Sequence, residues 1–214
     1  MEIKIQNISK TFENKIFENF SLDIPDGKTT VIMGKSGCGK TTLFNMLCGI
    51  LKADNGEITF SEPPVISAVF QENRLFETFT GYENLKAVTE DEEKIRTVLE
   101  ICEATDFADT KVKHMSGGMK RRISIARALC FEASLYLMDE PFKGIDIAMK
   151  DRILFKIQQY LSGKTCVIIT HDIAEAVNLA HNMIILASQP AQIVYSGNIS
   201  KDNIGKIETI IKNI

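Results

Sequence analysis

The sequence contains no long hydrophobic stretch and no leader-like amino terminus. Its longest apolar runs, such as residues 183–187 and 166–169, fall far short of the roughly 20 apolar residues that a membrane-spanning helix needs. The first ten residues, MEIKIQNISK, alternate charged and apolar side chains and lack the apolar core of a signal peptide. These absences predict a chain without a membrane segment or a secretion signal of its own.

Cysteine and histidine are scattered, and charge is nearly balanced. The five cysteines are odd in number and form no CxxC pair, and the three histidines show no metal-ligand spacing. Reduced thiols in a cytoplasmic protein are therefore expected, and not a disulfide framework or a zinc site. The 25 basic and 28 acidic residues give a net charge of −3, which argues against nucleic-acid binding by bulk charge.

The pattern of apolar residues predicts a single α/β domain over residues 1–214, with 44% hydrophobic residues to build its core. Apolar–polar alternation predicts an antiparallel β layer at the front of the chain. Helical periodicity dominates an insertion at about 80–131, which begins with a capping box at Thr80 and Glu83. The α/β core is then expected at about 1–79 and 132–214, with continuous apolar strands at 135–138 and 166–169.

A glycine-rich stretch at residues 34–41, GKSGCGKT, matches the pattern G-x-x-x-x-G-K-[ST]. Glycines allow backbone N–H groups to curl around phosphate oxygens, and the following helix presents its amino terminus to an anion. Lys40 would supply a charge to the β- and γ-phosphates, and the Thr41 hydroxyl would bind Mg²⁺. The stretch lies between a predicted strand and a predicted helix, so it is interpreted as a phosphate-binding (Walker A) loop.

Two acidic residues, Asp139 and Glu140, end the apolar strand that begins at Leu135. Unpaired carboxylates at the edge of a core are costly, so their presence needs a reason. Mg²⁺ binding would explain Asp139, and activation of an attacking water would explain Glu140. The simpler alternative is an aspartate that caps the end of the strand.

Three further motifs resemble those of the ATP-binding cassette (ABC) family. Residues 115–120, MSGGMK, resemble the LSGGQ signature and precede a predicted helix. Gln71 follows a predicted strand, as the Q-loop glutamine of the family does, and residues 140–146, EPFKGID, resemble its D-loop. His171 resembles the switch histidine at a strand end. Taken singly, each motif is equally compatible with an ordinary loop amide, helix start or structural histidine; their order after a phosphate loop carries the resemblance.

The resemblance implies an ABC nucleotide-binding domain, that is, a P-loop NTPase core with an antiparallel β layer and an inserted α-helical subdomain. It implies ATP and Mg²⁺ as ligands and a head-to-tail homodimer, in which the signature of one subunit faces the γ-phosphate held by the other. Hydrolysis would involve Glu140, His171, Gln71 and Lys40, and Mg²⁺ would be held by Thr41, Gln71 and Asp139. Nucleotide contacts are expected from Phe12, which would stack on adenine, and from Gly34, Lys35, Ser36, Gly37, Cys38, Gly39, Lys40, Thr41, Thr42, Ser116, Gly117, Gly118 and Asp146.

The signature departs from the family pattern at two positions. Met115 replaces leucine at similar volume, whereas Met119 replaces glutamine and cannot donate a side-chain hydrogen bond. The contact that this glutamine makes in the family is therefore in doubt.

The SGGM and EPFKG stretches, and residues 69–75, VFQENRL, resemble the nitrate/sulfonate/taurine-type importer group.

The leading hypothesis is the ATPase subunit of a membrane transporter that powers uptake of a small polar solute. A separate permease and, indirectly, an extracytoplasmic solute-binding protein would be its partners, and no nucleic acid is expected. The chain would lie at the inner face of the cell membrane through its permease contacts. Its length also predicts a bare cassette without a C-terminal regulatory domain.

The alternatives are an exporter or lipid-extraction ATPase, a cassette ATPase of DNA repair or translation, and a small-molecule kinase. Repair types need a much longer insertion between Gly39 and Ser116, translation types carry two cassettes, and a kinase has no use for the SGG motif. The sequence does not name the solute.

Cys38 lies inside the phosphate loop. An accessible thiol there would be activated by the helix amino terminus, and its alkylation would block ATP binding. A buried and inert thiol is the alternative.

Overall fold

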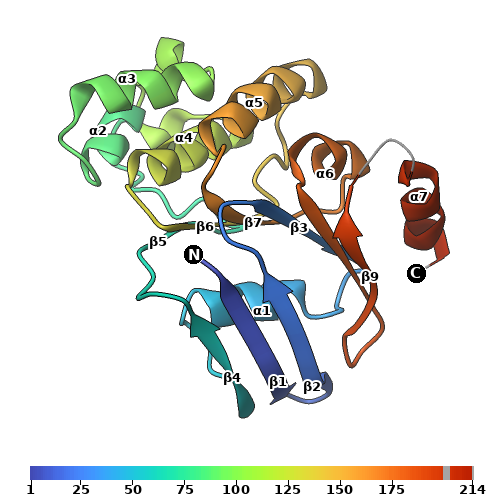
Figure 1. The fold of residues 1–214 in the computed structure, drawn as a ribbon. Helices are drawn as coiled ribbons and strands as arrows, with labels where there is room; N and C mark the ends of the chain where they lie inside the picture. The colour runs from blue at the N-terminus through green and yellow to red at the C-terminus, as the bar shows by residue number, and fades with distance from the viewer. Residues whose placement is uncertain (200–202, 214) are drawn as a thin grey trace.

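The computed structural model describes residues 1–199 and 203–213, so residues 200–202 and Ile214 of the predicted domain lie outside the described residues. Two sheets and a set of helices make up the fold (Figure 1). The smaller sheet has the strand order β2-β1-β4 and is antiparallel. Its strands are β1 (Ile3–Thr11), β2 (Lys15–Ile24) and β4 (Asn55–Phe60).

The alternating pattern at the front of the chain forms the antiparallel layer that it predicts. Ile3 and Ile5 of β1 are buried while the residue between them is exposed. Strand β4 already includes Asn55 and Gly56. Asn55 pairs with Ser9 of β1, and this pairing extends the strand.

The larger sheet has six strands in the order β5-β6-β7-β3-β8-β9. All neighbours are parallel except β8 and β9, which are antiparallel. The central strands are buried along their whole length, as continuous apolar runs predict. The strands are β3 (Thr29–Gly34), β5 (Ile66–Val69), β6 (Leu135–Asp139), β7 (Thr165–Ile169), β8 (Asn182–Ala187) and β9 (Gln192–Asn198).

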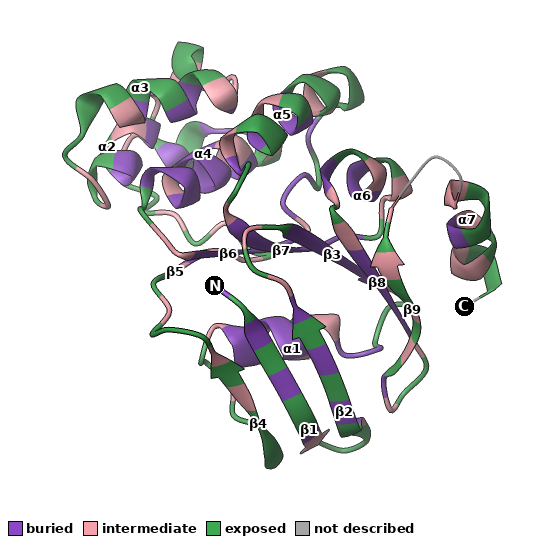
Figure 2. Ribbon diagram, in the orientation of Figure 1, coloured by how far each residue is buried: buried purple, intermediate pink, exposed green. Residues whose placement is uncertain are grey.

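Two hydrophobic cores lie on opposite faces of the larger sheet, because successive strand residues point to opposite faces. Leu135 and Leu137 of β6 pack with α1 (Lys40–Leu47) and the antiparallel layer. Tyr136 and Met138 pack on the other face with the remaining helices. Figures 1 and 2 show α1 between the two sheets and the buried stripes of the helices turned toward the larger sheet. These helices include α5 (Ile147–Tyr160), α6 (Ile173–Leu179) and α7 (Ile204–Asn213).

The residues that the structure describes between β5 and β6 form helices and no β-strand. Thr80 and Glu83 form the predicted capping box, in which each side chain accepts a hydrogen bond from the other residue's backbone N–H. The helices are α2 (Gly81–Lys86), α3 (Glu92–Ile101) and α4 (Gly117–Cys130), with short 3-10 turns at Thr105–Phe107 and Val112–His114. The division of the chain at about residues 80 and 131 remains a prediction. Over residues 1–199 and 203–213, no helix is both long and apolar enough to cross a membrane.

Candidate active site

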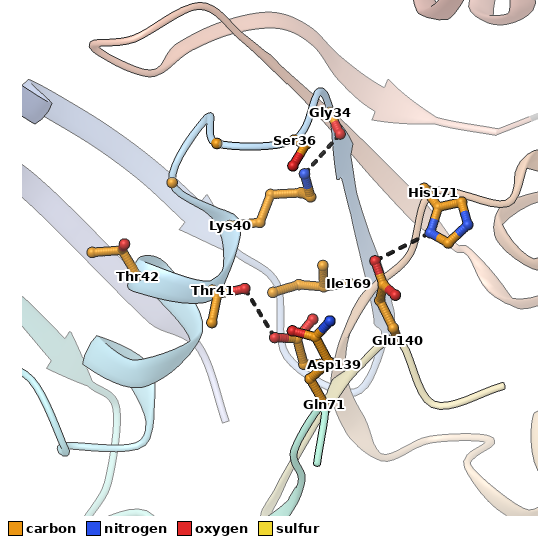
Figure 3. A pocket seen from close by; sticks show the side chains of 12 residues that line it. Gly34, Ser36, Lys40, Thr41, Thr42, Gln71, Asp139, Glu140, Ile169 and His171 are labelled. Carbon is orange, nitrogen blue, oxygen red and sulfur yellow. Dashed lines mark hydrogen bonds and ion pairs between the residues drawn. The ribbon is translucent and has the colours of Figure 1, made fainter. Parts of the chain in front are cut away.

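Strands β3, β6 and β7 run parallel and end at the same edge of the sheet, where ligands bind in folds of this kind. Their last residues are Gly34, Asp139 and Ile169. A cavity of about 370 Å³ opens at this edge. It is lined by Gly34, Ser36, Gly37, Gly39, Lys40, Thr41, Thr42, Gln71, Asp139, Glu140, Ile169 and His171. Figure 3 shows the labelled side chains around this cavity.

The phosphate-loop motif forms a closed loop between β3 and α1. Lys40 Nζ donates hydrogen bonds to the backbone oxygens of Gly34 (2.7 Å) and Lys35 (2.8 Å), as Figure 3 shows in part. Gly34 has a φ of 152°, and a Cβ at this position would lie 2.3 Å from the Leu186 carbonyl oxygen. Glycine is therefore required where the loop leaves the sheet.

Thr41 and Asp139 point toward one another across the cavity (Figure 3), and the Thr41 hydroxyl donates to Asp139 Oδ2 at 3.1 Å. Asp139 is 2% exposed, and burial raises the pKa of its carboxyl despite the hydrogen bond from Thr41. A nearby cation would offset this cost of burial. A hydroxyl and a carboxylate are ligands that Mg²⁺ accepts together with substrate phosphates, so these residues fit that ion. No cluster of three or more acidic, histidine or cysteine side chains that could hold a metal occurs within 1–199 and 203–213, so a complete protein cage is not formed there.

Glu140 lies one residue beyond β6 and faces His171, which lies two residues beyond β7. His171 Nδ1 and Glu140 Oε1 are 3.1 Å apart (Figure 3). Burial would raise the pKa of Glu140, but its contacts with Lys143 (3.2 Å) and His171 outweigh burial and lower it. An ionised carboxylate is the form that can accept a proton.

The Glu140 backbone has a φ of 47°, which is unusual for a residue with a side chain. A left-handed backbone costs about 1–2 kcal/mol in a residue other than glycine. Strain of this kind is found at sites where the surrounding structure holds a side chain in a functional position.

The signature residues lie outside this cavity. Ser116 caps α4, and its hydroxyl accepts a hydrogen bond from Met119 N at 3.3 Å. A Cβ on Gly118 would lie 2.9 Å from the carbonyl oxygen of Gly144, so the signature packs closely on the predicted D-loop. Gly117 is exposed, and a Cβ added there would meet no atom within 4 Å.

Four other predicted nucleotide residues do not line the main cavity either. Phe12 is 57% exposed on the antiparallel layer, with Lys10 Nζ 5.5 Å from its ring centre. Asp146 caps α5 by accepting hydrogen bonds from the N–H groups of Ala148 and Met149. Lys35 lines a neighbouring cavity with His171, and Cys38 is buried.

The sequence allows two interpretations of the Cys38 thiol, an accessible nucleophile or a buried and inert group, and burial argues against the first. Only 3% of the residue is exposed, and its Sγ lies 3.8 Å from Lys40 Nζ inside the loop. Reagents cannot reach a thiol in this position without opening the loop. The structure therefore favours the buried-thiol alternative over an accessible nucleophile.

Sequence reasoning did not single out Lys143 or Ile169. Lys143 forms an ion pair with Glu140 three residues before it, and that spacing is a signal that could have been used. Ile169 lines the cavity as an apolar strand end, and nothing in the sequence distinguishes it from its neighbours.

Comparison with known proteins agrees with this arrangement. The family model described as "ABC transporter" matches residues 17–143, which include the phosphate loop, Gln71, the signature and Glu140. The chain belongs to the ABC transporter family. As a family member it is an ATP-binding protein and an ATP hydrolase of the ABC type.

Several ABC relatives match most of the chain. Protein BruAb2_1123 of Brucella abortus biovar 1 is 36% identical over an alignment of 194 positions that covers 82% of this chain and 74% of that protein. The spermidine/putrescine import ATP-binding protein PotA of Borreliella afzelii is 33% identical over an alignment of 207 positions that covers 86% of this chain and 59% of PotA. The bicarbonate transport ATP-binding protein CmpD of Synechococcus elongatus is 30% identical over an alignment of 229 positions that covers 96% of this chain and 79% of CmpD.

Two solved ABC structures share the fold. The dimeric structure of MJ0796, a bacterial ABC transporter cassette, superposes with a TM-score of 0.83 and 26% identity over 92% of this chain and 99% of that chain. A dimeric post-hydrolysis state of MJ0796 bound to ADP and Pi gives a TM-score of 0.79 and 26% identity over 90% and 99% of the two chains.

Proposed function

We propose that this chain is the ATPase subunit of an importer and drives uptake of a small polar solute through a separate permease. Support comes from PotA and CmpD, whose names describe import of spermidine or putrescine and transport of bicarbonate. The chain would act at the cytoplasmic face of the membrane, held there by the permease. An extracytoplasmic solute-binding protein would deliver the solute to that permease.

The hydrolytic roles in the proposed reaction are inferred from the contact between Glu140 and His171, in which Glu140 Oε1 and His171 Nδ1 lie 3.1 Å apart. Backbone N–H groups of the phosphate loop and Lys40 bind the phosphates of ATP. Glu140 accepts a proton from the attacking water, and His171 holds the Glu140 carboxylate in place and contacts the γ-phosphate. Gln71, which lines the same cavity, positions the water and the metal ion.

Thr41, Asp139 and Gln71 are the residues that would hold Mg²⁺. When bound, this ion neutralises charge on the β- and γ-phosphates. The oxygen donors of Thr41 and Asp139 lie 3.1 Å apart, which agrees with two groups that share one ion.

A second copy of the chain completes the site in this proposal. Ser116 and Gly118 lie at the amino terminus of α4 but do not line the cavity of their own chain. A helix amino terminus with free N–H groups binds anions, so the signature of a partner subunit would contact the γ-phosphate. Both matched MJ0796 structures are dimeric, which supports this arrangement. Phe12 would stack on adenine and Asp146 would contact the partner subunit.

A groove beside the site is the proposed seat of the permease. It is lined by Phe44, Phe70, Glu72 and Arg74, together with Asn45 and three residues of the nucleotide site. Phe76 and Phe79 form a ring pair close by in the sequence and are 54% and 42% exposed. An apolar helix of the permease would cover these rings and sense Gln71.

Replacement of Glu140 by glutamine tests the hydrolytic role. Glu140→Gln keeps the size of the side chain but removes the base, so ATP hydrolysis should slow by about 10²–10⁴-fold. An ATP-bound dimer should accumulate, which size-exclusion chromatography with MgATP can detect. Glu18→Gln, a change at an exposed carboxylate of β2, is the matched control. Hydrolysis at the wild-type rate in Glu140→Gln would show that another group activates water.

The transport assignment has a separate test. ATP hydrolysis by the purified chain should rise on addition of the cognate permease in lipid vesicles. Addition of nucleic acid or of a small phosphoryl acceptor should leave the rate unchanged. Stimulation by nucleic acid without any effect of a permease would contradict the proposal.

A further inference from the structure

Arg121 is a buried arginine in the second turn of α4, with only 3% of its surface exposed. Its guanidinium donates hydrogen bonds to backbone carbonyls and to one side-chain amide oxygen. An arginine has five N–H donors in a rigid plane, so a cage of this kind can satisfy all of them. Burial lowers the pKa of Arg121.

Three of the acceptors are consecutive carbonyls at the end of β6. Nη2 donates to the carbonyl oxygens of Asp139 (2.7 Å) and Glu140, and Nε donates to that of Pro141 (2.9 Å). Nη1 reaches the opposite segment, where it donates to the carbonyl oxygens of Phe70 (2.6 Å) and Gln71 (3.3 Å). One side chain therefore joins the segment of Glu140 to the segment of Gln71.

The backbone of Glu140 is held from both sides. Its N–H donates to the Ile169 carbonyl oxygen at 2.8 Å, and its own carbonyl accepts from Arg121. These two hydrogen bonds fix the peptide planes around a residue whose φ is 47°. Those planes set the direction of the Glu140 Cα–Cβ bond, and the carboxylate lies beside His171.

We propose that Arg121 is a positioning residue for ATP hydrolysis, which holds the Asp139–Pro141 segment against Gln71 so that the Glu140 carboxylate faces the cavity. It acts through backbone carbonyls and does not touch the nucleotide. The proposal rests on the proposed role of Glu140 and goes beyond it, because it places part of the catalytic geometry in the helix that begins after Ser116.

Two substitutions distinguish the loss of the Arg121 hydrogen bonds from a general loss of stability. Arg121→Met keeps much of the length of the side chain but removes all donors, whereas Arg121→Lys keeps the charge and up to three donors. The matched control is Arg122→Met, because Arg122 is the next residue of α4 and is half-buried, but it donates to the Glu103 carbonyl and stacks on Phe107, away from the cavity. The assays are steady-state hydrolysis of MgATP by the full chain, binding of a fluorescent ATP analogue and hydrogen exchange of backbone amides.

A displaced catalytic group costs up to about 10²-fold in rate, so kcat of Arg121→Met should fall by about 10- to 10²-fold. KM and the affinity for the ATP analogue should change less than about threefold, since the phosphate loop is untouched. Amides of residues 139–143 should exchange faster, and those of residues 34–41 should not. Arg121→Lys should recover part of kcat, and Arg122→Met should keep the wild-type kcat.

A folded Arg121→Met variant with wild-type kcat would overturn the proposal, and so would an equal loss of kcat in Arg122→Met. If Arg121→Met does not fold, Arg121→Lys provides the test. Wild-type kcat in Arg121→Lys, together with wild-type amide exchange of residues 139–143, would overturn the proposal. The role of Glu140 is judged separately by Glu140→Gln. A wild-type rate in that variant, together with a slow Arg121→Met whose 139–143 amides exchange faster, would support the positioning role of Arg121 and reject Glu140 as the base.

Discussion

The cluster of charged side chains beneath His171 allows a quantitative test of the structure. Lys150 Nζ of α5 contacts Asp172 Oδ2 and lies 3.1 Å from Glu175 Oε1 of α6. The Thr170 hydroxyl donates to the other oxygen of Glu175 at 2.5 Å. The Glu175 side chain is 6% exposed, whereas that of Asp172 is 31% exposed. Lys150 is therefore the cation that compensates a deeply buried carboxylate and links α5 to the segment that carries His171.

Lys150→Met removes that cation and leaves Glu175 with its hydrogen bond from Thr170. Removal of one partner of a fully buried ion pair costs about 3–5 kcal/mol. The exposed part of the cluster, at Asp172, contributes less than about 1 kcal/mol. Because Lys150 is 13% exposed and keeps some water, we expect a loss of about 2–3 kcal/mol. For a chain of this size the melting temperature should fall by about 5–10 °C.

Urea denaturation measures this loss, and a double variant assigns its cause. Glu175→Gln in the Lys150→Met background removes the uncompensated charge, so the double variant should be more stable than Lys150→Met alone. Lys156→Met, on the same helix but 40% exposed, is the control and should cost less than about 1 kcal/mol. A loss below about 0.5 kcal/mol in Lys150→Met, or additive effects in the double variant, would refute the reasoning.

The same cluster predicts a dependence on pH. Burial would lower the pKa of Lys150, but its hydrogen bonds to Asp172 and Glu175 raise it, so its contribution is lost as pH rises through the raised value. Burial would raise the pKa of Asp172, but its bond with Lys150 lowers it, so its contribution is lost as pH falls through the lowered value. The difference between wild type and Lys150→Met should therefore be largest between about pH 5 and pH 9.

Two further predictions concern other parts of the chain. Gly34→Ala places a Cβ 2.3 Å from the Leu186 carbonyl oxygen. It should therefore lower the free energy of unfolding by about 2 kcal/mol or more and weaken binding of an ATP analogue. The control is Gly205→Ala, whose added Cβ meets no atom within 4 Å and which should have neither effect. Chemical denaturation and fluorescence titration check both effects. Hydrogen bonds from Arg152 lower the pKa of Glu103 to about 2 from 4.5, so its stabilising contribution is present above pH 4.5 and is lost as pH falls toward 2. Because this cluster is partly exposed, Glu103→Gln should cost about 1 kcal/mol at pH 7 and much less at about pH 2, as urea unfolding at both values would show; an equal cost at both would contradict the assignment.

Much of the site could be predicted because its residues occur in short linear motifs at strand ends. The phosphate loop, Asp139, Glu140 and His171 each lie at or just beyond the end of an apolar strand, and parallel strands bring their carboxyl ends together. The alternating pattern at the front of the chain likewise predicts the antiparallel layer. Local signals suffice for these features, since each depends on neighbours in the sequence.

Other features depend on contacts between distant residues and leave no such signal. Arg121 reads as a polar position in a helix, yet its partners lie about 20 and 50 residues away. Lys150 and Glu175 look like ordinary surface charges of two helices until the fold buries them together. Burial of the Cys38 thiol also depends on how the loop closes over α1, which its sequence does not reveal.

Because of the left-handed backbone at Glu140, selection for stability and selection for ATP turnover favour different residues at this position. Glycine adopts a φ of 47° without the strain that glutamate carries, so Glu140→Gly would relieve about 1 kcal/mol at this one position. A library of variants selected for heat resistance alone would therefore enrich glycine at residue 140 and discard the carboxylate. Under the role proposed for Glu140, such variants would bind nucleotide but not hydrolyse it, so selection for thermostability has to include ATP turnover as a second criterion.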